Sequence, residues 1–222
     1  MLLAIENVLT TEELASARVI LAKAQFVNER GDEGELAAKV KYNLQLSSGA
    51  EEQILTKLAY DAIHRNALFI AAALPRAVCP PLFNRYVPDM SFGTHVDNAI
   101  NIGAVMLRTD VSMTLFLSGP EEYEGGELLI EDTYGVQRVK LPAGSLVVYP
   151  SSSLHRVEPI TSGYRDVAVF WVQSLVRDIT QRSLLFQLDA NIQSLRARTP
   201  ESPEIISLVS CYHNLLRMWA DV

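Results

Sequence analysis

Two residue types that ligate metals stand close together in the middle of the chain. His95 and Asp97 are two residues apart in a run, residues 91–97, that predicts a β-strand. Because successive side chains of a strand alternate between its faces, these two project to the same side and can close on one cation. His155 comes much later, at the start of another predicted strand, residues 154–158. The spacing therefore predicts a metal site with two imidazoles and one carboxylate as protein ligands.

Two histidines and one carboxylate on one face of an octahedron leave the opposite positions free for other ligands. That arrangement is typical of non-haem Fe(II) oxygenases, in which substrate and O₂ use the open positions. Arg165 follows His155 by ten residues, across a glycine turn and in what is expected to be the adjacent strand. Its planar guanidinium suits a carboxylate through two hydrogen bonds. The four residues together predict an iron centre beside a site for a carboxylate.

Other residues compete for these roles less well. Arg177 and Arg182 fall in a predicted helix, and His64 lies on or near the polar side of another, where it is expected to face solvent. His213 and Cys211 stand two apart on the predicted last helix, where such positions do not face each other, so no metal pair is expected. An acidic stretch offers a conceivable calcium site, but a solvated loop and hairpin edge is the preferred interpretation. Its members are Glu121, Glu122, Glu124, Glu127, Glu131 and Asp132.

Length and composition limit the class of protein. A chain of 222 residues suits one main domain, and 49% hydrophobic with 20% charged residues is ordinary for a soluble globular protein. No apolar run reaches the roughly 18 residues that a membrane span needs, and the start lacks the basic segment of a secretory signal. The net charge of −7 argues against nucleic acid as the main partner. Two cysteines far apart in sequence predict no disulfide framework and favour a cytoplasmic location.

The helices that flank the site are predicted from their starts and their apolar stripes. Residues 10–28 predict a helix that begins with a capping box of Thr10 and Glu13. Ser48 and Glu51 repeat that spacing and predict a second helix, which ends at the following proline at the latest. Towards the other end of the chain, the period becomes helical again after residue 176. One helix is expected at 182–195, and another is expected to start at Ser202-Pro203 and to run to about Ala220.

Between these helices the period is that of β-strands. Turn signals rich in glycine and proline separate short runs, with no helical segment between them. A parallel α/β sheet would need such helices, so the pattern predicts a double-sheet jelly roll whose interior mouth holds the metal ligands. The fold class is therefore mainly β with flanking helices (α+β): a jelly-roll domain at 1–176 and a C-terminal helical extension at 177–222. The predicted strands are 82–87, 91–97, 111–117, 127–131, 137–141, 145–149, 154–158 and 166–173.

Several motifs together resemble one enzyme family. The chain looks like the Fe(II)- and 2-oxoglutarate-dependent dioxygenases of the prolyl/lysyl hydroxylase type. Its tail, at 171–178 and Gln181-Arg182, more narrowly resembles bacterial PKHD-type hydroxylases. The resemblance covers nearly the whole chain and is most specific at 82–190. The motifs that carry it are Asn84-Arg85-Tyr86-Val87, His95-Val96-Asp97, the runs 121–128 and 142–155, and Gly163-Tyr164-Arg165.

This resemblance implies a double-stranded β-helix in which His95, Asp97 and His155 hold Fe(II). It implies that Arg165 binds the distal carboxylate of 2-oxoglutarate, and that Tyr86 contacts the same carboxylate, although the residues after Tyr86 depart from those of related prolyl hydroxylases. Ascorbate is the implied reductant. The implied reaction consumes O₂, releases succinate and CO₂ and oxidises a substrate, and the carboxylate ligand favours hydroxylation over halogenation.

Other interpretations stay open at this point. A sensor that binds iron and 2-oxoglutarate without turnover, a cupin-like binding protein and a metal-free jelly-roll module share parts of the pattern, and turnover of 2-oxoglutarate separates the enzyme from all three. The substrate, small-molecule or peptidyl, cannot be identified; segments 31–48 and 98–110 are candidates to contact it. Thr114 shares a predicted strand face with Ser112 and is a candidate to line the pocket. The terminal helices are candidates for a homo-oligomer interface.

Overall fold

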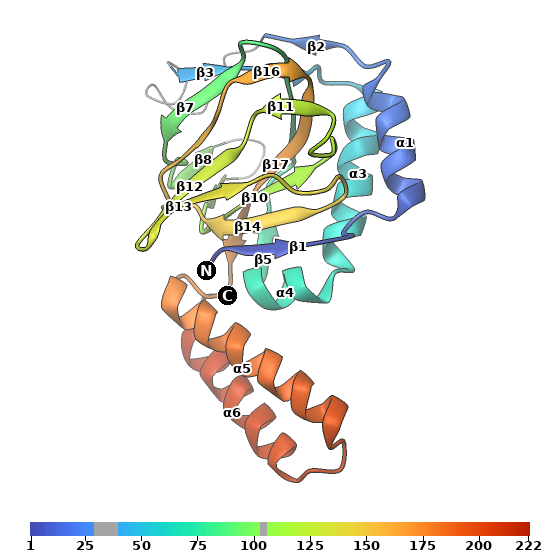
Figure 1. Cartoon of the computed structure of the whole chain (residues 1–222). Helices are drawn as coiled ribbons and strands as arrows, with labels where there is room; N and C mark the ends of the chain where they lie inside the picture. Colours follow the sequence, from blue (N-terminus) through green and yellow to red (C-terminus); the bar gives the residue numbers. More distant parts are fainter. Residues whose placement is uncertain (29–39, 103–105) are drawn as a thin grey trace.

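The computed structural model describes residues 1–28, 40–102 and 106–222. Its framework is a pair of antiparallel sheets that enclose a common interior (Figure 1). In the larger sheet the order is β1 (Leu3–Ile5), β14 (Leu146–Pro150), β10 (Val111–Phe116), β17 (Arg165–Ser174), β6 (Leu82–Tyr86), β4 (Leu44–Leu46) and β2 (Phe26–Val27). An eighth strand, β5 (Pro75–Val78), also pairs with β17.

The smaller sheet carries both histidines of interest. Its order is β13 (Gly135–Val139), β12 (Leu128–Asp132), β15 (His155–Val157), β7 (Ser91–His95) and β3 (Lys41–Tyr42). Two further pairs complete the β structure: β11 (Tyr123–Gly125) with β16 (Ile160–Gly163), and β8 (Ile100–Ile102) with β9 (Met106–Arg108). The predicted jelly roll is confirmed, and so is the mainly β fold class.

The eight predicted strands are all present, with ends that shift by one or two residues. Two details of the prediction were wrong. The strand predicted to continue to Asp97 ends at His95, and β17 does not lie beside β15: β16 comes between them in the chain, and β17 belongs to the larger sheet. The other strands, β1 to β5, β8, β9, β11 and β16, have two to four residues, too few to display an alternating pattern in the sequence.

The N-terminal helices follow the prediction in type but not in length. The capping box of Thr10 is confirmed at α1 (Thr11–Leu21), which ends seven residues before the predicted end because Phe26 pairs with Leu46 in the larger sheet. Ser48 does not cap the next helix, α3 (Ala50–His64), whose N-cap is a glycine with no side-chain hydrogen bond. The predicted second helix is in fact two, since the side chain of Asn66 caps a new helix, α4 (Ala67–Ala73).

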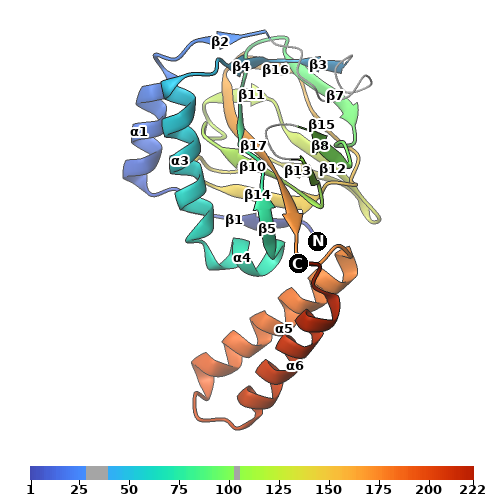
Figure 2. The same ribbon diagram turned by 180° about the vertical axis from the view of Figure 1, so that it is seen from behind.

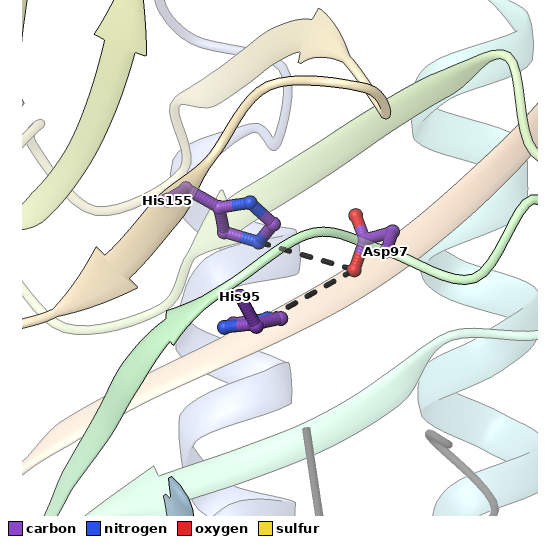
Figure 3. Close-up of side chains that lie close together, drawn as sticks. All are labelled: His95, Asp97 and His155. Carbon is purple, nitrogen blue, oxygen red and sulfur yellow. Dashed lines mark ion pairs between the residues drawn. The ribbon is translucent and has the colours of Figure 1, made fainter. Parts of the chain in front are cut away.

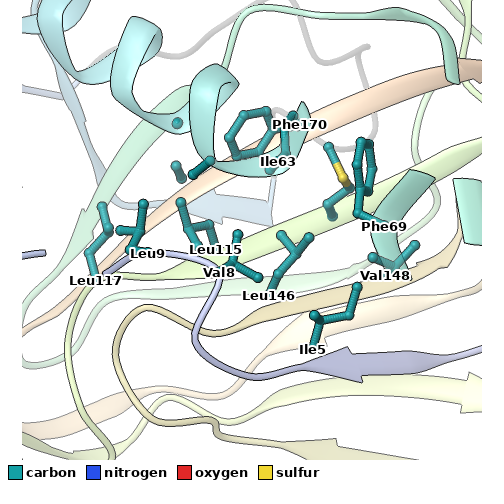
Figure 4. Packing of buried hydrophobic residues seen from close by; sticks show 14 of the residues in the cluster. Ile5, Val8, Leu9, Ile63, Phe69, Leu115, Leu117, Leu146, Val148 and Phe170 are labelled. Atoms are coloured by element: carbon teal, nitrogen blue, oxygen red, sulfur yellow. The ribbon is translucent and has the colours of Figure 1, made fainter. Parts of the chain in front are cut away.

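The outer face of the larger sheet packs against these helices. Alternate residues of β10 and β17, such as Met113 and Phe170, point outward and are fully buried beneath α1, α3 and α4 (Figures 1 and 4). The intervening residues of the same strands point inward, where Val167 and Phe116 join a second apolar cluster between the two sheets. The core therefore has two layers, one on each side of the larger sheet.

The last two helices form a hairpin that extends away from the barrel (Figures 1 and 2). They are α5 (Ile179–Arg198) and α6 (Glu204–Trp219), and the predicted cap by Ser202 was wrong, because its hydroxyl donates to the Glu204 carboxylate instead. Arg182 joins the hairpin to the barrel: its guanidinium donates to the carbonyls of Val176 and Arg177, both at 2.7 Å, and of Asp110 at 3.3 Å. None of the helices in the described part of the chain combines the length and hydrophobicity of a bilayer span.

Candidate active site

Two neighbouring strands of the smaller sheet bring three potential metal ligands together. His95 ends β7, His155 begins β15, and the antiparallel register places them directly opposite each other, with ring centroids 4.2 Å apart. Asp97 follows β7, and its Oδ1 lies 4.0 Å from His95 Nε2 and 3.9 Å from His155 Nε2 (Figure 3). All three side chains are at most 10% exposed. Within the described ranges they are the one group of three or more potential ligands that converges.

Hydrogen bonds fix the proton on each imidazole. The Nδ1 of His95 is 2.8 Å from the carbonyl oxygen of Gly93, and the Nδ1 of His155 is 3.0 Å from that of Ser153. A carbonyl oxygen only accepts, so Nδ1 carries the hydrogen and Nε2 keeps its lone pair directed at Asp97. Burial, and secondly the nearby His155, lower the pKa of His95 to about 4. His95 is therefore neutral at neutral pH, the state that a metal ligand requires.

The three residues fit a divalent transition metal. With metal–ligand bonds of about 2.1 Å, neighbouring ligand atoms on one face of an octahedron stand about 3.0 Å apart. The ligand atoms of the three residues all lie within 4.8 Å of one another, and the carboxylate oxygen is 4.0 and 3.9 Å from the two imidazole nitrogens, so small side-chain movements would bring them onto one ion. A mixed set of nitrogen and oxygen donors from three side chains leaves half of an octahedron for other ligands. The donor set thus suits the non-haem iron chemistry predicted from the sequence.

Asp97 is anchored from the opposite sheet. The Ser112 hydroxyl, on β10, donates to Asp97 Oδ2 at 2.5 Å, and the hydroxyls of Ser112 and Ser151 are 2.8 Å apart. Because the single hydroxyl hydrogen of Ser112 goes to the carboxylate, Ser151 donates to Ser112. This pair holds Oδ2, which leaves Oδ1 turned towards the imidazoles. Asp97 thus lies beyond the strand and is held by the larger sheet rather than by strand alternation.

Arg165 is the second feature of the barrel interior. It begins β17, is 1% exposed, and its guanidinium carbon lies 5.3 Å from the ring centroids of both Tyr86 and Phe116. Among the described residues it has no acidic partner, and its Nε has no hydrogen bond. Burying an unpaired cation costs on the order of several kcal/mol. The geometry therefore calls for an anion in this part of the interior.

Tyr86 lies where the sequence placed it, beside Arg165. The two residues face each other in the register of β6 and β17, and Tyr86 is 2% exposed. The next residue along β17, Asp166, cannot neutralise Arg165, because it projects to the outer face and pairs there with Arg85. The structure thus brings the predicted residues together as two neighbouring groups, the three potential metal ligands and the arginine with its tyrosine.

Some residues of the site were not singled out from the sequence. Ser151 and Tyr123 gave no usable signal, since serines in a turn and a tyrosine beside a double glycine are common. Thr114 was predicted to share a strand face with Ser112 and to line the pocket, and the two residues alternate with apolar residues along β10, a central strand, where both are buried. A polar stripe on a strand covered on both faces indicates a lined cavity rather than a solvated face. Thr114 lies on that inner face, where it interacts with the buried Tyr149.

The competing candidates do not join the site. His64 and His213 are exposed, as expected of surface histidines. Glu122, in the acidic stretch, pairs with Arg18, and that stretch forms no group of potential ligands in the described chain. Of the segments predicted to contact substrate, residues 31–39 and 103–105 lie outside the described residues. The remainder of those segments contains β3, β4, β8 and β9.

Comparison with known proteins agrees with this geometry. Residues 81–173 match the 2OG-Fe(II) oxygenase superfamily, and residues 180–221 match the PKHD-type hydroxylase C-terminal domain. A PKHD-type hydroxylase of Variovorax paradoxus is 52% identical over 228 residues, covering 100% of both chains. One of Acinetobacter baylyi is 52% identical over 98% of both chains.

Solved structures share the fold at low sequence identity. A prolyl hydroxylase from Trichoplax adhaerens, in complex with a hypoxia-inducible-factor peptide fragment, has a TM-score of 0.56 and 15% identity over 82% of this chain and 86% of that one. The viral collagen prolyl hydroxylase of Paramecium Bursaria Chlorella virus-1, in complex with 2-oxoglutarate, has a TM-score of 0.54 and 17% identity over 78% and 96%. The chain therefore belongs to the PKHD-type hydroxylases and is an Fe(II)- and 2-oxoglutarate-dependent dioxygenase.

Proposed function

We propose that His95, Asp97 and His155 are the iron ligands of this dioxygenase. The observation that carries the proposal is the convergence of two imidazole Nε2 atoms and one carboxylate oxygen, one of the imidazoles coming from His155, which is distant in sequence from the other two residues. The hydrogen bonds of each Nδ1 to a backbone carbonyl support it, because they hold the rings with Nε2 inward before any metal arrives. Asp97 offsets part of the charge of the ion.

Arg165 binds the distal carboxylate of 2-oxoglutarate. Its burial, with no acidic partner among the described residues, is what a site for a dicarboxylic 2-oxo acid needs. Tyr86 packs against the guanidinium and lines the same site. The bound iron and 2-oxoglutarate supply the oxidising chemistry, in which O₂ is consumed, 2-oxoglutarate becomes succinate and CO₂, and the substrate is hydroxylated. The protein binds and orients these partners and excludes water.

Ascorbate is the reductant in this proposal, and the substrate is a small molecule or a peptidyl group. Structural neighbours include both a prolyl hydroxylase with a peptide and a protein from Streptomyces hygroscopicus with hygromycin B bound, so the shared fold does not choose between them. Substrate contact is assigned to segments 31–48 and 98–110. The polypeptide near the barrel mouth is where function varies on a shared scaffold.

The remaining assignments concern organisation and location. Residues 1–176 form the dioxygenase domain and 177–222 the helical extension, since β17 ends at Ser174 and α5 begins at Ile179. The extension is also proposed as a homo-oligomer interface. Two apolar side chains of α6 support this, since Ile206 is 76% exposed and Met218 is 74% exposed.

The two cysteines without disulfides fit a cytoplasmic protein, and the net charge of −7 fits one that binds neither nucleic acid nor membranes.

The formation of succinate tests the proposed site. Protein purified without oxygen is given Fe(II), 2-oxoglutarate and ascorbate, and succinate is measured after exposure to air. Slow turnover without substrate is expected for wild type and for His64→Ala, whose side chain is exposed, but not for His95→Ala or His155→Ala. Omission of ascorbate should lower the number of turnovers per protein. Binding of both iron and 2-oxoglutarate with no succinate under any condition would favour the sensor, and binding of neither would contradict the site.

A further inference from the structure

Tyr123 brings an unused hydrogen-bonding group to the neighbourhood of Arg165. It lies on β11, outside both main sheets, and is 3% exposed. Its hydroxyl is fully buried and has no hydrogen-bond partner within the described chain, and the same is true of Arg165 Nε. A buried hydroxyl without a hydrogen-bond partner destabilises the folded chain, so it calls for a physical explanation.

The Tyr123 ring and the Arg165 side chain converge on one glycine. Gly126 has φ +66°, and a Cβ placed on it would stand 2.2 Å from Ile160 Cδ1, 3.1 Å from Tyr123 Cε2 and 3.2 Å from Arg165 Cδ. The ring edge next to the hydroxyl and the stem of the guanidinium therefore flank the same point. Lys140 fixes the tyrosine from another side: its Nζ donates to the Tyr123 carbonyl at 2.8 Å and lies 4.2 Å from the ring centroid.

The chemistry of this pair favours an anionic ligand. Burial raises the pKa of the Tyr123 phenol, an effect that Arg165 opposes only in part, so the hydroxyl keeps its hydrogen at neutral pH. A guanidinium has donors and no acceptor, and therefore cannot accept that hydrogen. Two buried donors beside each other need an acceptor with more than one oxygen. A carboxylate supplies it, since it accepts several hydrogen bonds at once.

We propose that Tyr123 donates a hydrogen bond to the distal carboxylate of 2-oxoglutarate and so helps the protein to select a dicarboxylic 2-oxo acid. The inference rests on the proposed role of Arg165 and extends it to a residue on a different strand pair. Phe116 packs against the same guanidinium but has no hydroxyl, so it cannot take this part. The orphan hydroxyl is then a binding group whose partner arrives with the cosubstrate.

The experiment compares two ligands that differ at the distal carboxylate. Binding of 2-oxoglutarate and of 2-oxopentanoate, which lacks that carboxylate, is measured by calorimetry on the Mn(II)-loaded protein without oxygen. Tyr123→Phe should weaken 2-oxoglutarate about tenfold, the loss of one hydrogen bond to a charged group, and leave 2-oxopentanoate unchanged. The control Tyr60→Phe removes a phenol that donates to the Val78 carbonyl at 3.1 Å, and both affinities should remain those of wild type.

Thermal unfolding of the metal-free protein gives a second readout. Tyr60→Phe should lower Tm because it deletes a made hydrogen bond, whereas Tyr123→Phe should leave Tm unchanged or raise it. Equal weakening of both ligands by Tyr123→Phe, or a loss of Tm as large as that of Tyr60→Phe, would overturn the inference. Arg165→Gln distinguishes a failure of the proposed role of Tyr123 from a failure of the proposed cosubstrate site. If it does not weaken 2-oxoglutarate more than 2-oxopentanoate, the proposed cosubstrate site itself is wrong.

Discussion

The two faces of the larger sheet use the same strands for different purposes. On β17, Ala168 and Phe170 project outward into an apolar layer beneath the helices, where both are fully buried. On the inner face of β10, Ser112 and Thr114 are just as buried, yet they are polar and surround the proposed centre. Alternation along the strand thus separates a face built for stability from a face built for ligands, one residue at a time.

Two arginines on neighbouring strands make the contrast sharper. Arg85 projects outward and donates two hydrogen bonds of 2.7 Å to Asp166, so its charge is neutralised within the chain. Arg165 projects inward, is less exposed, and has no acidic partner in the described residues. The charge of Arg85 is balanced by a carboxylate of the chain itself, whereas Arg165 can bind an anion from solution. Variants on each face should therefore separate stability from binding.

The largest effect is expected on the inner face at the metal ligands. His155→Ala removes one of three protein ligands, so affinity for Mn(II) or Fe(II) should fall by more than the 10–100-fold typical of losing a residue that only orients a ligand. Succinate formation should disappear, while circular dichroism and Tm of the metal-free protein change little. Metal affinity is measured by calorimetry without oxygen, with His64→Ala as the control. Wild-type metal binding by His155→Ala would refute the assignment.

On the outer face the largest effect should be on stability alone. Phe170 is fully buried, and Phe170→Ala should reduce the free energy of unfolding by about 3–5 kcal/mol through lost burial and a cavity. Urea denaturation measures this loss, with Phe170→Leu as a milder control. The affinity of the folded fraction for 2-oxoglutarate should stay at the wild-type value. A change in that affinity comparable to the loss of stability would show that the two faces are not independent.

The two arginines allow a matched pair of substitutions. Arg165→Gln should weaken 2-oxoglutarate by about 2–5 kcal/mol, thirtyfold or more, because the buried carboxylate of the ligand loses its counter-charge. Arg85→Gln should leave that affinity unchanged but lower Tm, since Asp166, 5% exposed, then lacks its partner. Calorimetry and thermal unfolding of both variants distinguish the roles. The proposal fails if each variant affects both quantities to the same extent.

The sequence predicted those parts of the molecule that depend on local pattern. Strand β10 alternates between apolar and polar residues and β17 contains a long apolar run, so both can be recognised, and the types and order of His95, Asp97 and His155 indicate one kind of metal site before any fold is known. The helix predicted to reach residue 28 failed because Phe26 pairs with Leu46, a contact that no local period reveals. The strand that carries Arg165 was recognised but was placed beside the wrong neighbour, because the intervening β16 is too short to be recognised.

Contacts between the sheets could not be predicted at all. The hydrogen bond from Ser112 to Asp97 joins residues of opposite sheets, and Ser151 enters from a turn after β14. Each lies in an ordinary sequence context, and only packing of the sheets brings them together. The same holds for Tyr123 and Arg165. The residue types of a candidate metal site can therefore be recognised in the sequence, whereas the residues that hydrogen-bond to them emerge only with the tertiary structure.

The smallest effect is expected from the Ser112–Ser151 pair, which orients Asp97. Ser112→Ala leaves Asp97 Oδ2 without its donor, so the carboxylate loses its fixed rotation and Mn(II) affinity should fall by about 10–100-fold. Ser112→Thr keeps a hydroxyl at the same position and should restore most of the affinity, whereas Ser183→Ala, which removes a hydroxyl that donates to the Ile179 carbonyl within α5, should leave the affinity for metal unchanged. Because the Ser112 hydroxyl is hydrogen-bonded to the carboxylate and to Ser151, the affinity of the metal-loaded protein for 2-oxoglutarate should change much less than its affinity for metal. Equal losses in the two affinities would mean that Ser112 supports the whole inner face rather than Asp97 in particular.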